Sequence, residues 1–123
     1  MTSSEPDDAY AITTRDDEGT TLVTLRGEID AALRDQASEA MVFVVTQDNP
    51  VVADVADVTF IDSSGLAFLV QLHRLCAESG LGLDLRNPSH KLLELLEVLG
   101  MGGQFAVQRT AEREILGAGA TTT

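Results

Sequence analysis

The sequence predicts an α/β domain with a mixed β-sheet, and three observations support this class. A run rich in small or β-branched apolar residues at 51–58 is typical of a strand buried on both faces of a sheet. Apolar residues at helical spacing follow it, at Leu69, Leu72 and Cys76. Strand-like and helix-like patterns alternate along most of the chain, as in βα units joined by right-handed crossovers. The pattern alone leaves a doubly wound sheet open.

Two strands are expected near the amino terminus. Residues 1–8 are polar and acidic, so we expect a disordered tail there. A first strand at residues 9–15 and a second at residues 20–26 flank a turn signal at residues 16–19, whose glycine permits a hairpin. The two strands are therefore predicted to be antiparallel.

The next helix and strand have clear boundaries. Apolar residues recur every three or four positions from Ala31, and Asp30 stands where the N-cap of this helix belongs. The helix is expected to end before Asn49, because the proline after it disfavours a helical conformation there. A central strand is predicted at residues 51–55, and residues 57–61 lead from it into the next turn.

The second half of the chain continues the alternation of helices and strands. A helix from Ser63 to Ser79 ends at Gly80, since glycine readily adopts the left-handed conformation that closes helices. The elements expected after it are a strand at residues 81–85, a helix capped by Asn87 with Pro88 in its first turn and closed by Gly100, a strand at residues 104–108, a short helix capped by Thr110 and ending near residue 116, and a flexible tail at residues 117–123.

Length and charge limit the classes of partner. The 123 residues form one domain, and 44% of them are hydrophobic, which is enough for one core. Twenty acidic against eight basic residues give a net charge of −12, which repels nucleic acids and anionic membrane surfaces and attracts a basic protein partner. No apolar run approaches the roughly 20 residues of a membrane span, and the amino-terminal residues do not resemble a secretory signal. We therefore expect a cytoplasmic protein, in which the lone Cys76 forms no intrachain disulfide.

The junction between the central strand and the following helix carries two hydroxyl groups. Its sequence is Phe60-Ile61-Asp62-Ser63-Ser64-Gly65-Leu66. A helix N-terminus leaves backbone N–H groups without partners, and Asp62 or Ser63 can cap them. Gly65 lets the helix approach the sheet closely. A well-capped helix would by itself account for this local sequence.

Candidate catalytic residues are few. The two serines are not in a G-x-S-x-G turn, and neither His73 nor His90 has a partner at metal-ligand spacing. No glycine-rich loop precedes a lysine, so no nucleotide site is indicated. We therefore expect no enzymatic activity, no metal and no cofactor. A phospho-aspartate receiver domain is a weaker alternative, because Asp62 follows a central strand but the only lysine, Lys91, lies inside a predicted helix.

Two motifs in a fixed order resemble those of a known family. Gly-Glu-Ile-Asp at residues 27–30 follows one strand, and Asp-Ser-Ser-Gly-Leu at residues 62–66 follows another. This pair, with its flanking strands and helices, resembles the STAS domain and, within it, the bacterial anti-sigma factor antagonists. The resemblance covers about residues 10–116, so we expect a single STAS domain at residues 9–116. It implies a mixed four- to five-stranded sheet with helices mainly on one face.

The resemblance also implies a switch. Ser63 matches the serine that an anti-sigma factor with serine kinase activity phosphorylates in this family, and a serine phosphatase would reactivate the protein. Asp30 and Asp62 match aspartates that lie close to that serine, and Ser64 stands beside it. The unphosphorylated protein, a monomer or weak dimer, would bind the kinase and so release a sigma factor. The alternative is a constitutive STAS scaffold in a stress-signalling or transport-associated assembly.

Helical geometry at about 100° per residue divides the helix after Asp62 into two sides. The side that should pack on the sheet holds Gly65, Phe68, Leu69, Leu72 and Cys76. The side that should face solvent together with Ser63 holds Ala67, Gln71, Arg74 and Glu78. Leu66 and Val70 lie on the border. Either they form an apolar docking patch for the kinase beside Ser63, or they pack under a neighbouring helix.

Overall fold

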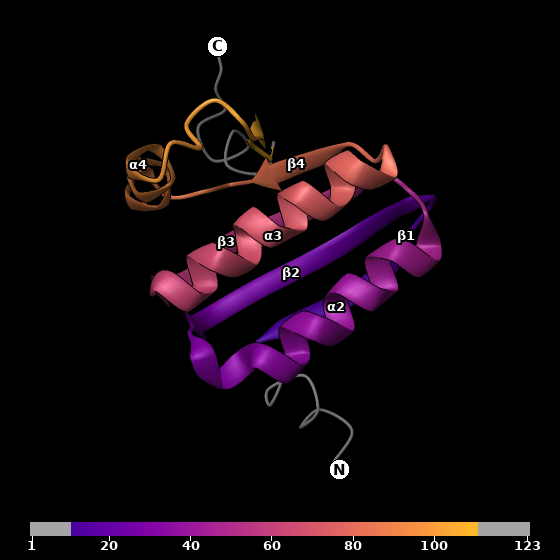
Figure 1. Cartoon of the computed structure of the whole chain (residues 1–123), viewed down its shortest axis with the longest axis horizontal. Helices are drawn as coiled ribbons and strands as arrows, with labels where there is room; N and C mark the ends of the chain where they lie inside the picture. Colours follow the sequence, from indigo (N-terminus) through magenta and orange to yellow (C-terminus); the bar gives the residue numbers. More distant parts are fainter. Residues whose placement is uncertain (1–10, 111–123) are drawn as a thin grey trace, which may run out of the picture.

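The sheet contains five strands in the order in which they occur in the sequence. In the computed structural model, which describes residues 11–110, the first two strands are antiparallel and the others follow in parallel. The strands are β1 (Ile12–Asp17), β2 (Thr20–Ile29), β3 (Val51–Ile61), β4 (Leu83–Arg86) and β5 (Ala106–Gln108). The helices are the 3₁₀-helix η1 (Ala31–Leu33), α2 (Arg34–Gln47), α3 (Ser63–Ser79) and α4 (His90–Val98). Helices α2 and α3 lie side by side on one face of the sheet (Figure 1). The predicted α/β class with a mixed sheet is confirmed.

The predicted amino-terminal hairpin is present, but its turn is shorter than residues 16–19 and β2 continues to Ile29, beyond the predicted end at residue 26. Glu18 and Gly19 connect β1 to β2 and have φ angles of 54° and 89°. Positive φ at both central residues suits a two-residue turn whose twist matches that of the strands. Asp16 stabilises the turn, because its Oδ1 accepts a hydrogen bond from the Gly19 N–H at 3.3 Å. Strand β1 extends to Asp17, beyond the predicted end at residue 15.

Helix α2 has defined residues at both ends. Asp30 caps the short η1 helix that precedes α2, and Asp48 closes α2 in the left-handed conformation with a φ of 55°. The helix therefore ends before Asn49, as predicted. Gln36 ties α2 to the sheet, since its Oε1 accepts hydrogen bonds at 2.9 and 3.0 Å from two backbone N–H groups near the start of β1.

Strand β3 is longer than predicted. It runs without interruption to Ile61, whereas the sequence indicated a strand only at residues 51–55. The added residues pair with the second half of β2 through two register shifts, which bring Ile29 opposite Ile61. A register shift breaks the alternation of inward and outward side chains. The strand predicted from that alternation was therefore shorter than β3. Strand β4 pairs only with residues 51–54 of β3, and the rest of β3 extends beyond it.

Helix α3 has the predicted limits, whereas β4 does not. The helix begins at Ser63 and is closed by Gly80, which has a φ of 74°. The Leu81 N–H donates to the Cys76 carbonyl at 2.8 Å. Because Leu81 belongs to this helix end, β4 begins at Leu83 rather than at residue 81.

The predicted cap of α4 is wrong. The N-cap is Ser89, whose hydroxyl oxygen accepts a hydrogen bond from the Leu92 N–H at 3.0 Å. Asn87 is buried instead and bonds to Thr110: its Oδ1 accepts from the Thr110 N–H at 3.1 Å, and its Nδ2 donates to the Thr110 hydroxyl at 3.2 Å. Pro88 therefore precedes the cap and lies outside the first turn.

The last strand, β5, is shorter than predicted. The Gln104 N–H donates to the Met101 carbonyl at 3.0 Å in a turn, so pairing with β4 begins only at Ala106. The helix predicted after Thr110 and both predicted tails lie outside the described residues.

The hydrophobic core lies between the sheet and the helices. The leucine and isoleucine side chains that are almost completely buried are Leu25, Ile29, Leu69, Leu72, Leu85 and Leu96. Burial of one such side chain stabilises the fold by roughly 1.5–3 kcal/mol, so the two from α3 hold this helix firmly on the sheet. None of the helices within residues 11–110 has the length and apolar content needed to cross a lipid bilayer.

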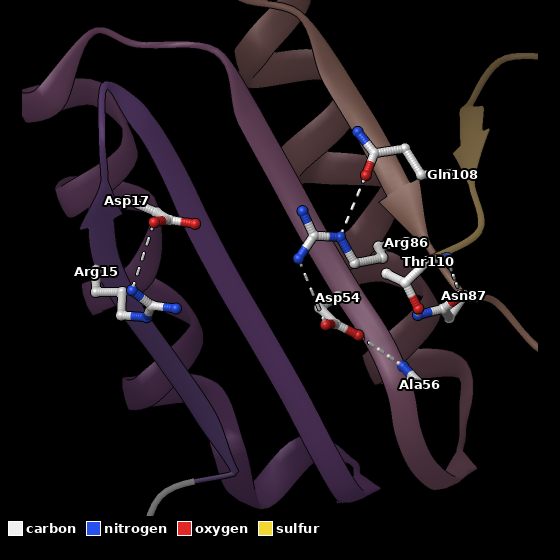
Figure 2. A network of polar contacts seen from close by, with 8 residues as sticks. All are labelled: Arg15, Asp17, Asp54, Ala56, Arg86, Asn87, Gln108 and Thr110. Carbon is white, nitrogen blue, oxygen red and sulfur yellow. Dashed lines mark hydrogen bonds and ion pairs between the residues drawn. The ribbon is translucent and has the colours of Figure 1, made fainter. Parts of the chain in front are cut away.

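The face of the sheet opposite α2 and α3, which we call the far face, carries a network of polar side chains (Figure 2). Arg86 on β4 lies 4.0 Å from the Asp54 carboxylate on β3, and its Nε donates to Oε1 of Gln108 on β5 at 3.2 Å. Gln108 in turn donates to Asp84 at 2.8 Å. These side chains point away from the core because residues alternate between the two faces of a strand. The network links three neighbouring strands.

Candidate functional site

Asp30 and Asp62 lie next to each other at the carboxyl ends of neighbouring strands. Ile29 at the end of β2 is paired with Ile61 at the end of β3, and each aspartate follows directly. The Asp62 N–H donates to the Ile29 carbonyl at 3.2 Å, which fixes the two turns relative to each other. The structure thus brings the two sequence motifs together.

Both aspartates are helix caps. Oδ1 of Asp62 accepts hydrogen bonds from the N–H groups of Ser64 and Gly65 at 2.9 and 3.1 Å. Oδ1 of Asp30 accepts one from the Ala32 N–H at 3.0 Å. Of the two candidates for the cap of α3, Asp62 is therefore the cap and Ser63 is not.

Ser63 is the first residue of α3, and its side chain is exposed. Within residues 11–110 its hydroxyl has no hydrogen-bond partner, because Asp62 supplies the cap. Ser64 is exposed as well, although its backbone N–H is held by the cap. The Ser63 hydroxyl is thus accessible at the positive end of the α3 dipole.

Gly65 allows α3 to contact the strand ends. A Cβ atom at this position would lie 2.5 Å from Cγ1 of Ile61 and 2.6 Å from the carbonyl oxygen of Ile29. Real Cβ atoms essentially never approach another atom so closely. Any larger residue would push the helix away from the sheet, which confirms the expected close approach at Gly65.

The strand ends carry the negative charges of Asp30 and Asp62, and Arg34 lines the same pocket as Asp30 and Ser64. Among the residues that the structure describes, neither Asp30 nor Asp62 forms an ion pair. An anion added at Ser63 would therefore be attracted by the α3 dipole and repelled by nearby carboxylates.

The two sides of α3 are arranged as predicted. The residues buried against the sheet include Gly65, Phe68, Leu69, Leu72 and Cys76. The exposed residues include Ala67, Gln71, Arg74 and Glu78. The helical geometry reckoned from Ser63 is thus confirmed, and the outer side of α3 is continuous with the serine.

The two border residues of α3 differ. Leu66 is 8% exposed and belongs to the hydrophobic core, which corrects its assignment to a partner-binding patch. The physical reason is packing from neighbouring elements, since Leu66 belongs to the same buried cluster as Leu69 of α3 and Leu92 of α4. Val70 is half-buried and lines a groove together with Ser63.

This groove has a volume of about 450 Å³ and runs between α3 and the segment that follows α4. It is lined by Ser63, Ala67, Val70, Gln71, Arg74, Leu99 and Met101. Leu99 and Met101 were not predicted as site residues, because Leu99 continues the apolar pattern of α4 and Met101 follows the glycine that closes it. The available signal was the glycines at 100, 102 and 103, which indicate that the chain turns back there.

The two histidines and the cysteine do not form a reactive site. Nε2 of His73 lies 3.1 Å from the Gln104 carbonyl oxygen, and the ring centroid lies 4.9 Å from that of Phe105. His90 is exposed on α4. Burial raises the pKa of the Cys76 thiol to about 11, so this thiol stays protonated and unreactive at neutral pH. In the described part of the chain, no cluster of three His, Cys, Asp or Glu residues could hold a metal ion.

Solved structures of bacterial regulators are similar over most of the chain. SpoIIAA of Bacillus in its phosphorylated form is 20% identical, with a TM-score of 0.67 over 88% of this chain and 98% of that one. An anti-sigma factor antagonist from Mycobacterium paratuberculosis is 26% identical, with a TM-score of 0.63 over 85% and 90% of the two chains. RsbS of Moorella thermoacetica is 14% identical, with a TM-score of 0.72 over 82% and 88%. Among curated proteins, none matches the sequence.

The family model described as "Mlab, STAS domain" matches residues 12–110. This range contains every strand and helix described above, together with both motifs at the strand ends. The five-stranded mixed sheet agrees with the fold of the solved neighbours. The chain therefore belongs to the STAS domain family, as the ordered pair of motifs at residues 27–30 and 62–66 implied.

Proposed function

We propose that the protein is an anti-sigma factor antagonist that is switched by phosphorylation of Ser63. The observation that carries this proposal is the accessible Ser63 hydroxyl at the start of α3, beside two carboxylates that are fixed as caps. The likeness to an anti-sigma factor antagonist of 26% identity supports the role. The similarity to SpoIIAA, whose structure is described as phosphorylated, supports a modification in this fold.

In the unphosphorylated state the exposed side of α3 binds an anti-sigma factor that is also a serine kinase. Binding displaces the sigma factor from that partner. Asp30, Asp62, Ser64 and Val70 contribute to the contact, since they surround Ser63 at the strand ends and on the same helix. The chain needs no catalytic residue of its own for this role.

Phosphorylation ends the contact through charge. A phosphate adds about −1.5 to −2 charges and three strong acceptors at one point. The α3 N-terminus stabilises that charge, so the fold tolerates it. A partner interface would bury the phosphate next to Asp62 and Asp30, where repulsion and lost hydration are costly. A serine phosphatase in the cytoplasm then restores the binding state.

The test is phosphorylation by purified serine kinases of the anti-sigma factor type from the same organism. Each kinase is incubated with ATP and the protein, and the modified residue is located by mass spectrometry. We expect phosphate on Ser63, none on Ser63→Ala, and normal incorporation into Ser64→Ala. Phosphate on Ser64 in the Ser63→Ala protein would contradict the assignment.

A constitutive scaffold is the second candidate function. The observation in its favour is the description of the matching family model, which names a STAS domain without a sigma factor. A scaffold would bind its partner equally well with or without phosphate. Ser63 that remains unmodified by every kinase of the set would favour this alternative over the switch.

A further inference from the structure

The groove between α3 and the segment after α4, which we call the α3–α4 groove, begins at Ser63. Ser63 and Arg74 mark its two ends on α3, which lie about 16 Å apart at 1.5 Å per residue. Ala67 and Gln71 lie between them on the outer side of the helix. Any protein that covers Ser63 along α3 therefore also covers the groove.

The opposite wall of the α3–α4 groove is apolar and partly exposed. Leu99 is 51% exposed, and Met101 lies beside it in the wall. Val98, the last residue of α4, is 83% exposed at the same end of that helix. Gly100 has a φ of 80°, so the chain reverses here. Leu99 stays half exposed, whereas Met101 is partly buried and packs against the core from the wall of the groove.

The charge of the α3–α4 groove differs from that of the whole chain. The protein has a net charge of −12, yet Arg74 is the only charged residue among the described residues that line this groove. Within residues 11–110, Arg74 forms no ion pair. The groove thus offers an apolar wall and one available guanidinium, which fits an apolar side chain with a neighbouring carboxylate.

We infer that the α3–α4 groove receives an apolar side chain of the anti-sigma partner, with an acidic residue of that partner paired to Arg74. This inference rests on the proposed function, because continuity with Ser63 is what selects this partner over other occupants. The general negative charge attracts a basic partner at long range, while the groove selects it at close range. Leu66 is buried in the core and cannot contact the partner, so Leu99 and Met101 supply the apolar contact in its stead.

The test uses the purified kinase that phosphorylates Ser63 in the assay above, loaded with a non-hydrolysable ATP analogue so that no phosphate is transferred. Its affinity is measured by calorimetry for Leu99→Asp and for the matched control Val45→Asp, which alters a 47% exposed valine on α2. We expect the dissociation constant to rise at least tenfold for Leu99→Asp and less than twofold for Val45→Asp. Circular dichroism melting verifies that both proteins are folded.

Charge reversal provides a second variant that leaves the apolar wall intact. Arg74→Glu should raise the dissociation constant about fivefold or more at low salt and less at high salt, because the lost pair is partly exposed and screened. Lys91→Glu is the control, since it makes the same change on the exposed side of α4. Equal effects of the two reversals would mean that only long-range charge is sensed and would overturn the role of Arg74.

The outcomes separate this inference from the proposed function. If no kinase modifies Ser63, the proposed function and the groove occupant both fall. If a kinase modifies Ser63 and binds Leu99→Asp within twofold of wild type, the proposed function stands and the groove inference falls. If light scattering shows that Leu99→Asp converts dimers into monomers without changing kinase affinity, a second copy of this chain occupies the groove and the inference is again overturned.

Discussion

The far face of the sheet and the strand ends beside α3 both carry aspartates, but the carboxylates have different hydrogen-bond partners in the two regions. On the far face, Arg86 and Gln108 bridge Asp54 and Asp84, so each carboxylate has a side-chain partner on a neighbouring strand. At the strand ends, the aspartates accept hydrogen bonds only from backbone N–H groups of the turns that they cap, as far as the described residues extend.

The difference shows which polar groups serve the fold alone. The carboxylates of the far face bond to side chains on neighbouring strands, so their removal should lower the free energy of unfolding. The carboxylates of the strand ends fix two helix starts and retain their charge, so they can also act on a phosphate or a partner nearby. Substitutions in the two regions should therefore affect different measurements.

The largest effect on stability is expected at the contact that fixes the strand ends to α3. Gly65→Ala should lower the free energy of unfolding by about 3 kcal/mol, because the new Cβ meets backbone and core atoms that cannot move away. Gly82→Ala is the matched control, since a Cβ there would meet no atom within 4 Å. Urea unfolding measures both, and similar losses for the two alanines would show that α3 is not held by this approach.

The next effect separates binding from stability at the strand ends. Ser63→Asp should weaken kinase binding at least tenfold, about 1.4 kcal/mol, because the new carboxylate stands in the interface beside Asp62. The free energy of unfolding should change by less than about 0.5 kcal/mol, since a helix N-terminus favours a negative charge. Ala77→Asp, at the other end of α3, is the control for added charge. Parallel losses of binding and stability would make Ser63 a structural residue.

A smaller effect distinguishes the cap from the charge of Asp62. Asp62→Ala should cost about 1 kcal/mol of stability, whereas Asp62→Asn keeps an amide oxygen for the cap and should cost much less. Thermal unfolding compares the two. Asp62→Asn should also let the phosphorylated protein bind the kinase more tightly than phosphorylated wild type does, because one repelling charge is gone. Unchanged affinity of the phosphorylated Asp62→Asn protein would remove Asp62 from the switch.

The smallest effect is expected on the far face. Arg86→Met should lower the free energy of unfolding by about 0.5–1 kcal/mol, since its pair with Asp54 is partly exposed and the ionic gain is modest. The rate of Ser63 phosphorylation should stay unchanged, which the mass-spectrometric assay can follow over time. A reduced rate would show that the two polar regions are coupled through β3.

Much of the fold could be predicted from the sequence because most helices and strands begin and end at residues whose effect is local. Gly80 ends α3 through its own backbone freedom, and Asp30 caps the turn that it begins. The errors arose where a distant residue decides the local structure. Asn87 has the composition of a cap, but it is bonded to Thr110 more than twenty residues later, and Ser89 caps α4 instead.

The candidate site was predictable in its centre and less so at its margin. The resemblance of the ordered motifs implied that Asp30 and Asp62 lie close together. The structure supplies the physical reason, since the two aspartates follow the paired carboxyl ends of neighbouring parallel strands. The border of α3 depends on which helix or loop packs against it, and helical periodicity contains no such information. Periodicity therefore left Leu66 between a docking patch and packing under a neighbouring helix, and its burial excludes the patch. Leu99 comes from another element, so periodicity could not associate it with Ser63.

The approach of Gly65 to the strand ends has a consequence for timing. Under the proposed function, this close contact opposes sliding of α3 when Ser63 is phosphorylated, so we expect no slow rearrangement of the helix before partner exchange. Under the proposed function, association with the kinase would then follow a single exponential, limited by diffusion and desolvation. The duration of the inactive state would equal the lifetime of one phosphoester bond. The amount of phosphatase in the cell would then set how long the protein stays inactive, and no conformational change of the protein would add to that time.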